Sequence, residues 1–142
     1  MHPIASPLIY VVDDDTDEHL LLGIVFSRQL NHVRLQCFNK GSELFAQLTH
    51  RLDGRLPDLI LLDLHMPIHS GLEVLQVLKT DPVWRSIPVA VRATYAREAE
   101  LNRCYELGSE TILSKNNSYI QLINWVRDLL DSYQPLTRTQ VI

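Results

Sequence analysis

The chain has 142 residues, 46% of them hydrophobic, and its 13 basic and 17 acidic side chains give a formal net charge of −4. This length fits one domain with a proper core and leaves no room for two. The mild acidity argues against direct binding of nucleic acid through bulk charge. The apolar runs are too short to span a membrane, and the N-terminus has no secretory signal pattern, so we expect a cytoplasmic protein.

Five short apolar runs, many of their residues β-branched, predict the strands of a sheet. Most of them are apolar throughout, as expected for strands buried on both faces. They cover residues 8–12, 33–37, 59–62, 87–91 and 111–113.

Longer segments between these runs have the spacing of amphipathic helices. Asp15 followed by Glu18 fits the start of the first helix, and Ser70 followed by Glu73 fits a later one. Ser118 with Gln121 fits the start of the last helix. The helix over residues 96–107 should end at Gly108, and the pair Asp81-Pro82 should end the helix before it.

Five strands thus alternate with five helices from about residue 8 to residue 132. This alternation predicts an α/β fold, with a doubly wound five-stranded parallel sheet between two layers of helices. Residues 133–142 form a tail that is too short for an output domain.

Charged residues follow three of the predicted strands. Asp13, Asp14 and Asp15 follow the first strand, Asp63 follows the third, and Lys115 follows the fifth. In a doubly wound sheet, ligands bind at the carboxyl ends of the strands, where these residues should converge. Carboxylates without a His or Cys partner favour Mg²⁺, and a lysine beside them suits an oxyanion. Together they suit phosphoryl transfer.

Structural interpretations of the same residues are open. Asp14 and Asp15 could simply begin a helix, where acids are favoured. Lys115 alone could be an ordinary surface lysine. Asp63 is harder to explain in this way, because an unpaired charge after a buried strand is costly.

Three segments resemble the receiver domains of response regulators. Residues 58–72 (DLILLDLHMPIHSGL) resemble the phosphoacceptor segment, which reads D-hydrophobics-D-x-x-M-P-x-x-x-G in that family. Residues 11–15 (VVDDD) resemble the acidic pair after its first strand, and residues 108–115 resemble the segment with its lysine. The resemblance covers about residues 7–132, and it implies a flavodoxin-like receiver fold with strand order 2-1-3-4-5.

The resemblance also implies a role for each site residue. Asp63 would take a phosphoryl group from a phosphohistidine. Asp14 and Asp63 would bind Mg²⁺ directly, together with the backbone carbonyl of His65, and Asp13 would act through a bound water. Lys115 would pair with Asp63 at rest and with the phosphoryl oxygens afterwards.

The sequence departs from the family pattern at three positions. Ala93 stands where receivers usually carry Thr or Ser at the end of the fourth strand, and Ile112 stands where they tend to carry Tyr or Phe. Asn116 replaces the proline after the lysine, and a cis bond before Asn costs roughly 3 kcal/mol. In addition, Arg92 lies at the end of an otherwise apolar strand.

We therefore expect a single-domain response regulator, a signalling domain rather than an enzyme. A sensor histidine kinase or histidine phosphotransfer protein would phosphorylate it, and it would bind a downstream protein that the sequence does not identify. Residues 96–131 would form its contact face and a possible homodimer interface. One alternative is a phosphorylation-independent interaction module, suggested by Ala93 and Ile112. Another is a small haloacid-dehalogenase-like phosphatase with Asp63 as its nucleophile, although His65 stands where that class has its general acid.

Overall fold

The computed structural model describes residues 6–141, with side chains as far as Ser132. Its five strands form one parallel sheet in the order β2-β1-β3-β4-β5, which confirms the predicted fold and strand order. The strands are β1 (Leu8–Val12), β2 (Arg34–Phe38), β3 (Leu59–Asp63), β4 (Val89–Ala93) and β5 (Thr111–Ser114). The helices are α1 (Thr16–Gln29), α2 (Gly41–His50), α3 (Gly71–Thr80), the 3₁₀ turn η1 (Trp84–Ser86), α4 (Glu98–Leu107) and α5 (Tyr119–Val141).

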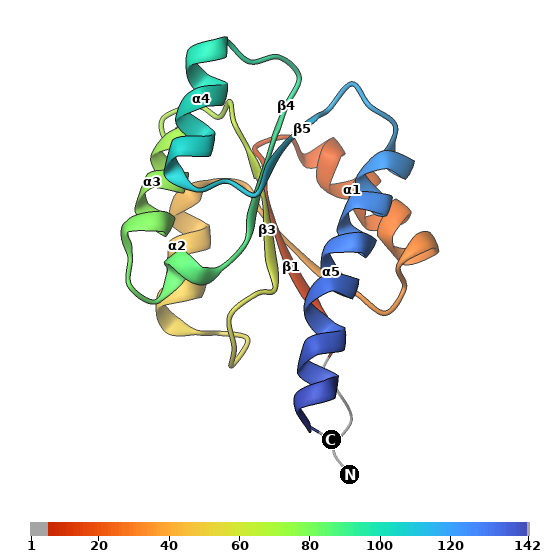
Figure 1. Cartoon of the computed structure of the whole chain (residues 1–142). Helices are drawn as coiled ribbons and strands as arrows, with labels where there is room; N and C mark the ends of the chain where they lie inside the picture. The colour runs from red at the N-terminus through yellow and green to blue at the C-terminus, as the bar shows by residue number, and fades with distance from the viewer. Residues whose placement is uncertain (1–5, 142) are drawn as a thin grey trace.

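Two helical layers cover the sheet (Figure 1). Helices α1 and α5 lie on one face, and α2, α3 and α4 lie on the other. The strands alternate their side chains between the two layers, so Ile9 and Val11 join one apolar core while Leu8, Tyr10 and Val12 join the other. Strands β1, β3 and β4 are buried along their whole length. None of the helices within the described residues is long and apolar enough to cross a membrane.

Strand β4 begins two residues later than the sequence predicts. The apolar run suggests residues 87–91, but the ladder starts at Val89. Pro88 has no N–H to donate and contributes only its carbonyl, which accepts from Ile60 N (2.9 Å). The strand also continues through Arg92 to Ala93, although the charged residue interrupts the apolar pattern.

The predicted helix boundaries are confirmed at several ends. Asp15 caps α1, since its side chain accepts from the backbone N–H groups of Asp17 and Glu18. Ser70 caps α3 in the same way. Gly108 ends α4 with a φ of 102°, a left-handed conformation that glycine adopts at little cost.

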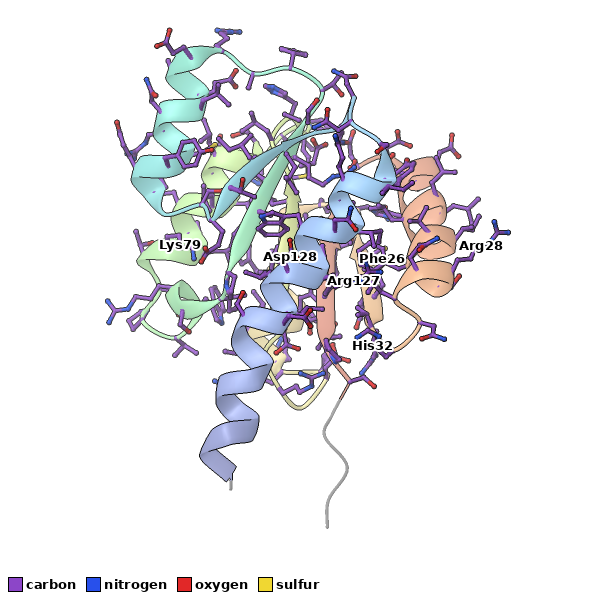
Figure 2. All side chains as sticks on the ribbon, turned by 45° about the vertical axis from the view of Figure 1, so that its right-hand side comes forward. Phe26, Arg28, His32, Lys79, Arg127 and Asp128 are labelled. Carbon is purple, nitrogen blue, oxygen red and sulfur yellow. The ribbon has the colours of Figure 1, made fainter. Side chains whose placement is uncertain are left out.

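Helix α5 packs along α1 and continues through the predicted tail to Val141, while Ile142 lies outside the described residues. The Arg127 guanidinium on α5 donates to the Gln29 carbonyl in the last turn of α1 (3.3 Å). Figure 2 labels Arg127 on α5 and Phe26 on α1, the two helices of this layer. The contact satisfies a carbonyl that the end of α1 leaves without a partner in the helix.

Candidate functional site

Two buried carboxylates lie side by side at the carboxyl ends of β1 and β3. Asp13 directly follows β1 and is 2% exposed, and Asp63 is the last residue of β3 and is 6% exposed. The last pair of the ladder between these strands is Val12 with Leu62, after which β1 opens to a loop while β3 continues one residue further, pairing Asp63 with Arg92 of β4. The predicted convergence of the first and third strand ends is therefore confirmed.

Asp14 completes a cluster of three acids with Asp13 and Asp63. One carboxylate oxygen from each residue lies within 4.8 Å of the other two. Asp14 is exposed while the other two are buried, so the cluster opens to solvent on one side. An all-oxygen donor set with an open side suits Mg²⁺, which keeps several of its own waters when a protein binds it. The donor atoms present thus fit the expected cation.

Lys115 lies directly against the buried acids. Its Nζ donates to Asp13 Oδ2 at 2.7 Å and lies 3.2 Å from Asp63 Oδ1. Its backbone N–H donates to the carbonyl of Ala93 (2.8 Å), which fixes the end of β5 beside β4. The resemblance to receiver domains predicts that Lys115 pairs with Asp63 at rest. In the structure, Lys115 contacts both acids and lies closer to Asp13.

The surroundings change the proton affinity of the site. Burial, and then the negative charge of Asp13, raise the pKa of Asp63 to about 6, although Lys115 and the His65 N–H act in the opposite direction. Burial lowers the pKa of Lys115, but the hydrogen bond and charge of Asp13, together with Asp63, outweigh it and raise this pKa. Lys115 therefore remains a cation, while Asp63 gains a proton at a higher pH than an ordinary aspartate does.

Gly71 determines the shape of the loop after Asp63. Its N–H donates to the Leu64 carbonyl (2.9 Å), and a Cβ at this position would lie 2.3 Å from the Asp63 carbonyl oxygen. Only glycine lets the first turn of α3 approach the strand end so closely. Steric crowding thus explains why the predicted motif has a glycine at this position.

His65 forms the rim of the site. Its N–H approaches Asp63 Oδ1 (3.4 Å), and its ring stacks on Tyr95 with the centroids 4.7 Å apart. Its Nε2 lies 3.0 Å from the Tyr95 carbonyl oxygen, and its Nδ1 lies 3.8 Å from a Glu100 oxygen. The side chain is therefore turned towards α4, and the predicted use of its backbone carbonyl as a metal ligand stays a prediction.

The three departures from the family pattern lie at the end of β4, within β5 and in the loop after β5. Ala93 is buried at the end of β4, and Ile112 packs against the same apolar core. Thr94 is exposed, and its carbonyl accepts from the Asn116 side chain (2.8 Å). The peptide bond before Asn116 is trans. Backbone and amide contacts thus connect the β4 and β5 loops.

Sequence reasoning missed two polar networks. Arg92 is buried and pairs with Glu18 of α1 (3.0 Å). At the amino ends of the strands, Asp53 accepts from the Tyr10 hydroxyl and also pairs with Arg34. The arginine within an apolar run is a signal for the first network, but its partner lies far away in the sequence and no spacing rule reveals it.

Comparison with known proteins gives one family. The model of the response regulator receiver domain matches residues 9–127. Response regulator Rcp1 of Synechocystis is 29% identical over 125 residues, which cover 86% of this chain and 84% of Rcp1. The probable methanogenesis regulatory protein FilR2 of Methanothrix harundinacea is 31% identical over 86% of this chain and 80% of FilR2. The chain spans 44% of another relative, the phosphate regulon transcriptional regulatory protein PhoB of Klebsiella pneumoniae.

Solved structures agree in fold. The phosphorylated cyanobacterial phytochrome response regulator RcpA has a TM-score of 0.77 at 28% identity, over 92% of this chain and 95% of that one. The Mn²⁺-bound form of Rcp1 has a TM-score of 0.70 at 27% identity, over 90% of this chain and 94% of that one.

Proposed function

Because the chain belongs to the response regulator receiver domain family of two-component signalling, we propose that it accepts a phosphoryl group on Asp63. The observation that carries the proposal is the geometry at the end of β3. There Asp63 lies with two further carboxylates inside 4.8 Å, and the Lys115 ammonium contacts the two buried acids. Receiver domains are signalling domains, and the proposed chemistry is a transfer to the protein itself.

The transfer is a substitution at phosphorus. A carboxylate oxygen of Asp63 attacks the phosphorus of a phosphohistidine, an acyl phosphate forms, and the P–N bond to the donor imidazole breaks. The imidazole leaves with the bond's electron pair and takes up a proton. Lys115 stays near the phosphoryl oxygens as a fixed positive charge.

We assign the divalent cation to Asp14 and Asp63 as direct ligands and to Asp13 through water, with the His65 carbonyl as a further ligand. The expected ion is Mg²⁺, which would neutralise charge on the phosphoryl oxygens when bound. The acid cluster supports this assignment, because three carboxylates this close repel one another and the one ammonium of Lys115 does not balance their charge.

The proposed donor is a sensor histidine kinase or a histidine phosphotransfer protein, in the cytoplasm. We propose residues 7–132 as the receiver domain, followed by the short segment 133–142.

The proposed contact face, residues 96–131, contains α4, β5 and most of the described part of α5. We propose that it binds the downstream protein or a second copy of the chain. The matches with Rcp1 and RcpA over most of their lengths support a protein of this kind.

A second function, binding without phosphorylation, is favoured by one observation. Ala93 is buried at the end of β4 and has no hydroxyl with which to contact a phosphoryl group on Asp63. The phosphatase alternative is not favoured by the family match. We test the module by comparing hydrogen exchange across residues 96–131 before and after phosphorylation. An unchanged pattern supports the module, and a change supports the phosphorylation-driven regulator.

Phosphorylation itself is tested with a small acyl phosphate and Mg²⁺, followed by the intact mass of the protein. We expect a gain of one phosphoryl group in the wild type and none in Asp63→Asn. Asp58→Asn is the matched control, because Asp58 directly precedes β3 at the opposite end of the strand and its substitution should leave the gain intact. No gain with any small donor or kinase would contradict the proposal.

A further inference from the structure

Arg92 is a buried charge within β4. It is 4% exposed, and the other four residues of the strand are apolar. Two residues before it, Ala90 belongs to the core under α1 and α5, and alternation places Arg92 on that same face. Its Nη2 lies 3.0 Å from Glu18 Oε1 in the first turn of α1. A charge in this place requires such a partner, because an unpaired buried charge is very costly.

Glu18 also accepts a hydrogen bond from a residue of α5. The Tyr119 hydroxyl donates to Glu18 Oε2 at 3.1 Å. Burial, and then the charge of Glu18, raise the pKa of Tyr119, so the phenol keeps the proton that it donates. Glu18 therefore connects the first turn of α1 with the end of β4 and the start of α5.

The pair also reaches the acid cluster along the backbone. Arg92 is the direct neighbour of Asp63 in the parallel ladder, and its carbonyl accepts from Leu64 N (2.9 Å). On the other side, the Glu18 N–H donates to the Asp15 side chain, and Asp15 N donates to Asp13 Oδ1 (2.9 Å). The ion pair thus bridges β4, the strand next to the one that carries Asp63, and the loop that carries the other two acids.

From these contacts we propose that Arg92, acting through Glu18, is a positioning residue that holds the β1–α1 loop where divalent-cation binding needs it. This role rests on the proposed function. The three carboxylates repel one another and the one ammonium of Lys115 does not balance their charge, so a restraint from outside the cluster helps to hold the loop. The pair contacts neither the cation nor the phosphoryl group and acts only through the loop.

Stability alone does not explain the pair. Replacing a buried ion pair by apolar side chains of similar volume is often neutral or stabilising. The pair is also imperfect, since Glu18 Oε1 and Arg92 Nε are buried without a hydrogen bond of good geometry within the described residues. A contact of this kind fits a role in fixing the position of a loop.

The test uses the double variant Arg92→Met/Glu18→Met, which removes both charges and keeps an apolar contact. Mn²⁺ binding is followed by electron paramagnetic resonance, with Mg²⁺ as competitor, and stability is followed by urea unfolding. We expect about tenfold weaker binding, at the lower end of what outer-shell substitutions cost, with a urea midpoint equal to or above the wild type. Tyr119→Phe removes only the hydroxyl and should weaken binding less.

Tyr10→Phe is the matched control. It also removes a hydroxyl that donates to a carboxylate, here Asp53 at the opposite end of the sheet, and should lower stability without changing Mn²⁺ affinity. Wild-type affinity in the double variant would overturn the positioning role alone, whatever the effect of Tyr119→Phe. A wild-type protein that binds no divalent cation would overturn the proposed function and this role with it.

Discussion

The Lys115 ammonium lies closer to Asp13 than to Asp63, at 2.7 Å against 3.2 Å. The contact of Asp63 with the ammonium is thus the longer of the two, and a second buried carboxylate lies beside it. This arrangement keeps the proposed phosphoacceptor available, because the strongest contact of the lysine is with its neighbour. It also leads to predictions about the cation, about pH and about the loop after Asp63.

Lys115→Met should increase the affinity of the site for Mg²⁺. Without the ammonium, Asp13 and Asp63 lose the cation that contacts them, and a bound metal supplies the positive charge in its place. We expect Mg²⁺ to bind at least about threefold more tightly, and to raise the Tm of the variant more than that of the wild type. Lys40→Met, at an exposed lysine, serves as the control. Equal Mg²⁺ effects in wild type and Lys115→Met would contradict the arrangement.

Asp63 should lower stability as pH rises. Its pKa is raised to about 6 in the folded protein from an ordinary 3.8, so the folded state binds more protons than the unfolded state between these values. The free energy of unfolding therefore falls across this range, by about 3 kcal/mol when the pKa moves from 3.8 to about 6. The contribution is absent below about pH 4 and complete above about pH 6.

The measurement is urea unfolding of wild type and Asp63→Asn in the presence of a chelator. The stability of the wild type relative to the variant should decline from about pH 4 to about pH 6. Asp53, whose pKa is lowered mainly by the Tyr10 hydrogen bond, favours the folded state as pH rises, but it does so in both proteins and cancels in the difference. A difference that stays flat, or rises, contradicts the raised pKa of Asp63.

Gly71→Ala should damage the loop after the acceptor strand. The added Cβ would lie 2.3 Å from the Asp63 carbonyl oxygen and 2.7 Å from Leu64 Cα, and these backbone atoms cannot move away independently. We expect a loss of about 2–3 kcal/mol in unfolding free energy, together with weaker metal binding.

Gly23→Ala is the matched control for this substitution. Gly23 lies inside α1, and a Cβ there meets nothing within 4 Å. Because alanine is the better helix former, this variant should be more stable by about 0.5–1 kcal/mol. Chemical denaturation of both variants checks the pair, and similar effects from the two substitutions would argue against the close approach at Gly71.

Ile68→Asn should stabilise the protein. Ile68 has a φ of 69° in the tight turn between Pro67 and His69, and its side chain is 89% exposed. A β-branched residue is strained in this region, whereas asparagine adopts it more easily, so we expect a gain of about 1 kcal/mol. Ile120→Asn changes an exposed isoleucine on α5 and should be neutral or slightly destabilising. Thermal unfolding of both variants would show the contrast, and a loss of stability in Ile68→Asn would contradict it.

The sequence predicts the fold well because each level of the pattern agrees with the next. The apolar runs, the capping residues Asp15 and Ser70, and Gly108 all mark element ends that the structure confirms. The meeting of Asp13, Asp63 and Lys115 follows from strand parallelism alone. By contrast, β4 is displaced by two residues because hydropathy does not show where ladder hydrogen bonding begins at Pro88.

The polar networks could not be predicted because their partners come from distant segments. In the sequence, Arg92 only interrupts an apolar strand, and its partner Glu18 is identified by the structure alone. Asp53 reads as a loop acid, although it receives hydrogen bonds from Tyr10, Arg34 and Gln47. Side-chain contacts between elements depend on tertiary packing, which a pattern along one chain does not contain.

The most direct test of the central claim is chemical mapping of the acceptor. The protein is incubated with a small acyl phosphate and Mg²⁺ and then treated with borohydride, which reduces an aspartyl phosphate to homoserine. Peptide mass spectrometry should find homoserine at position 63, and only when both donor and Mg²⁺ are present. Homoserine at position 13 or 14 instead, or at no position with any donor, would contradict the assignment of Asp63 as the phosphoacceptor.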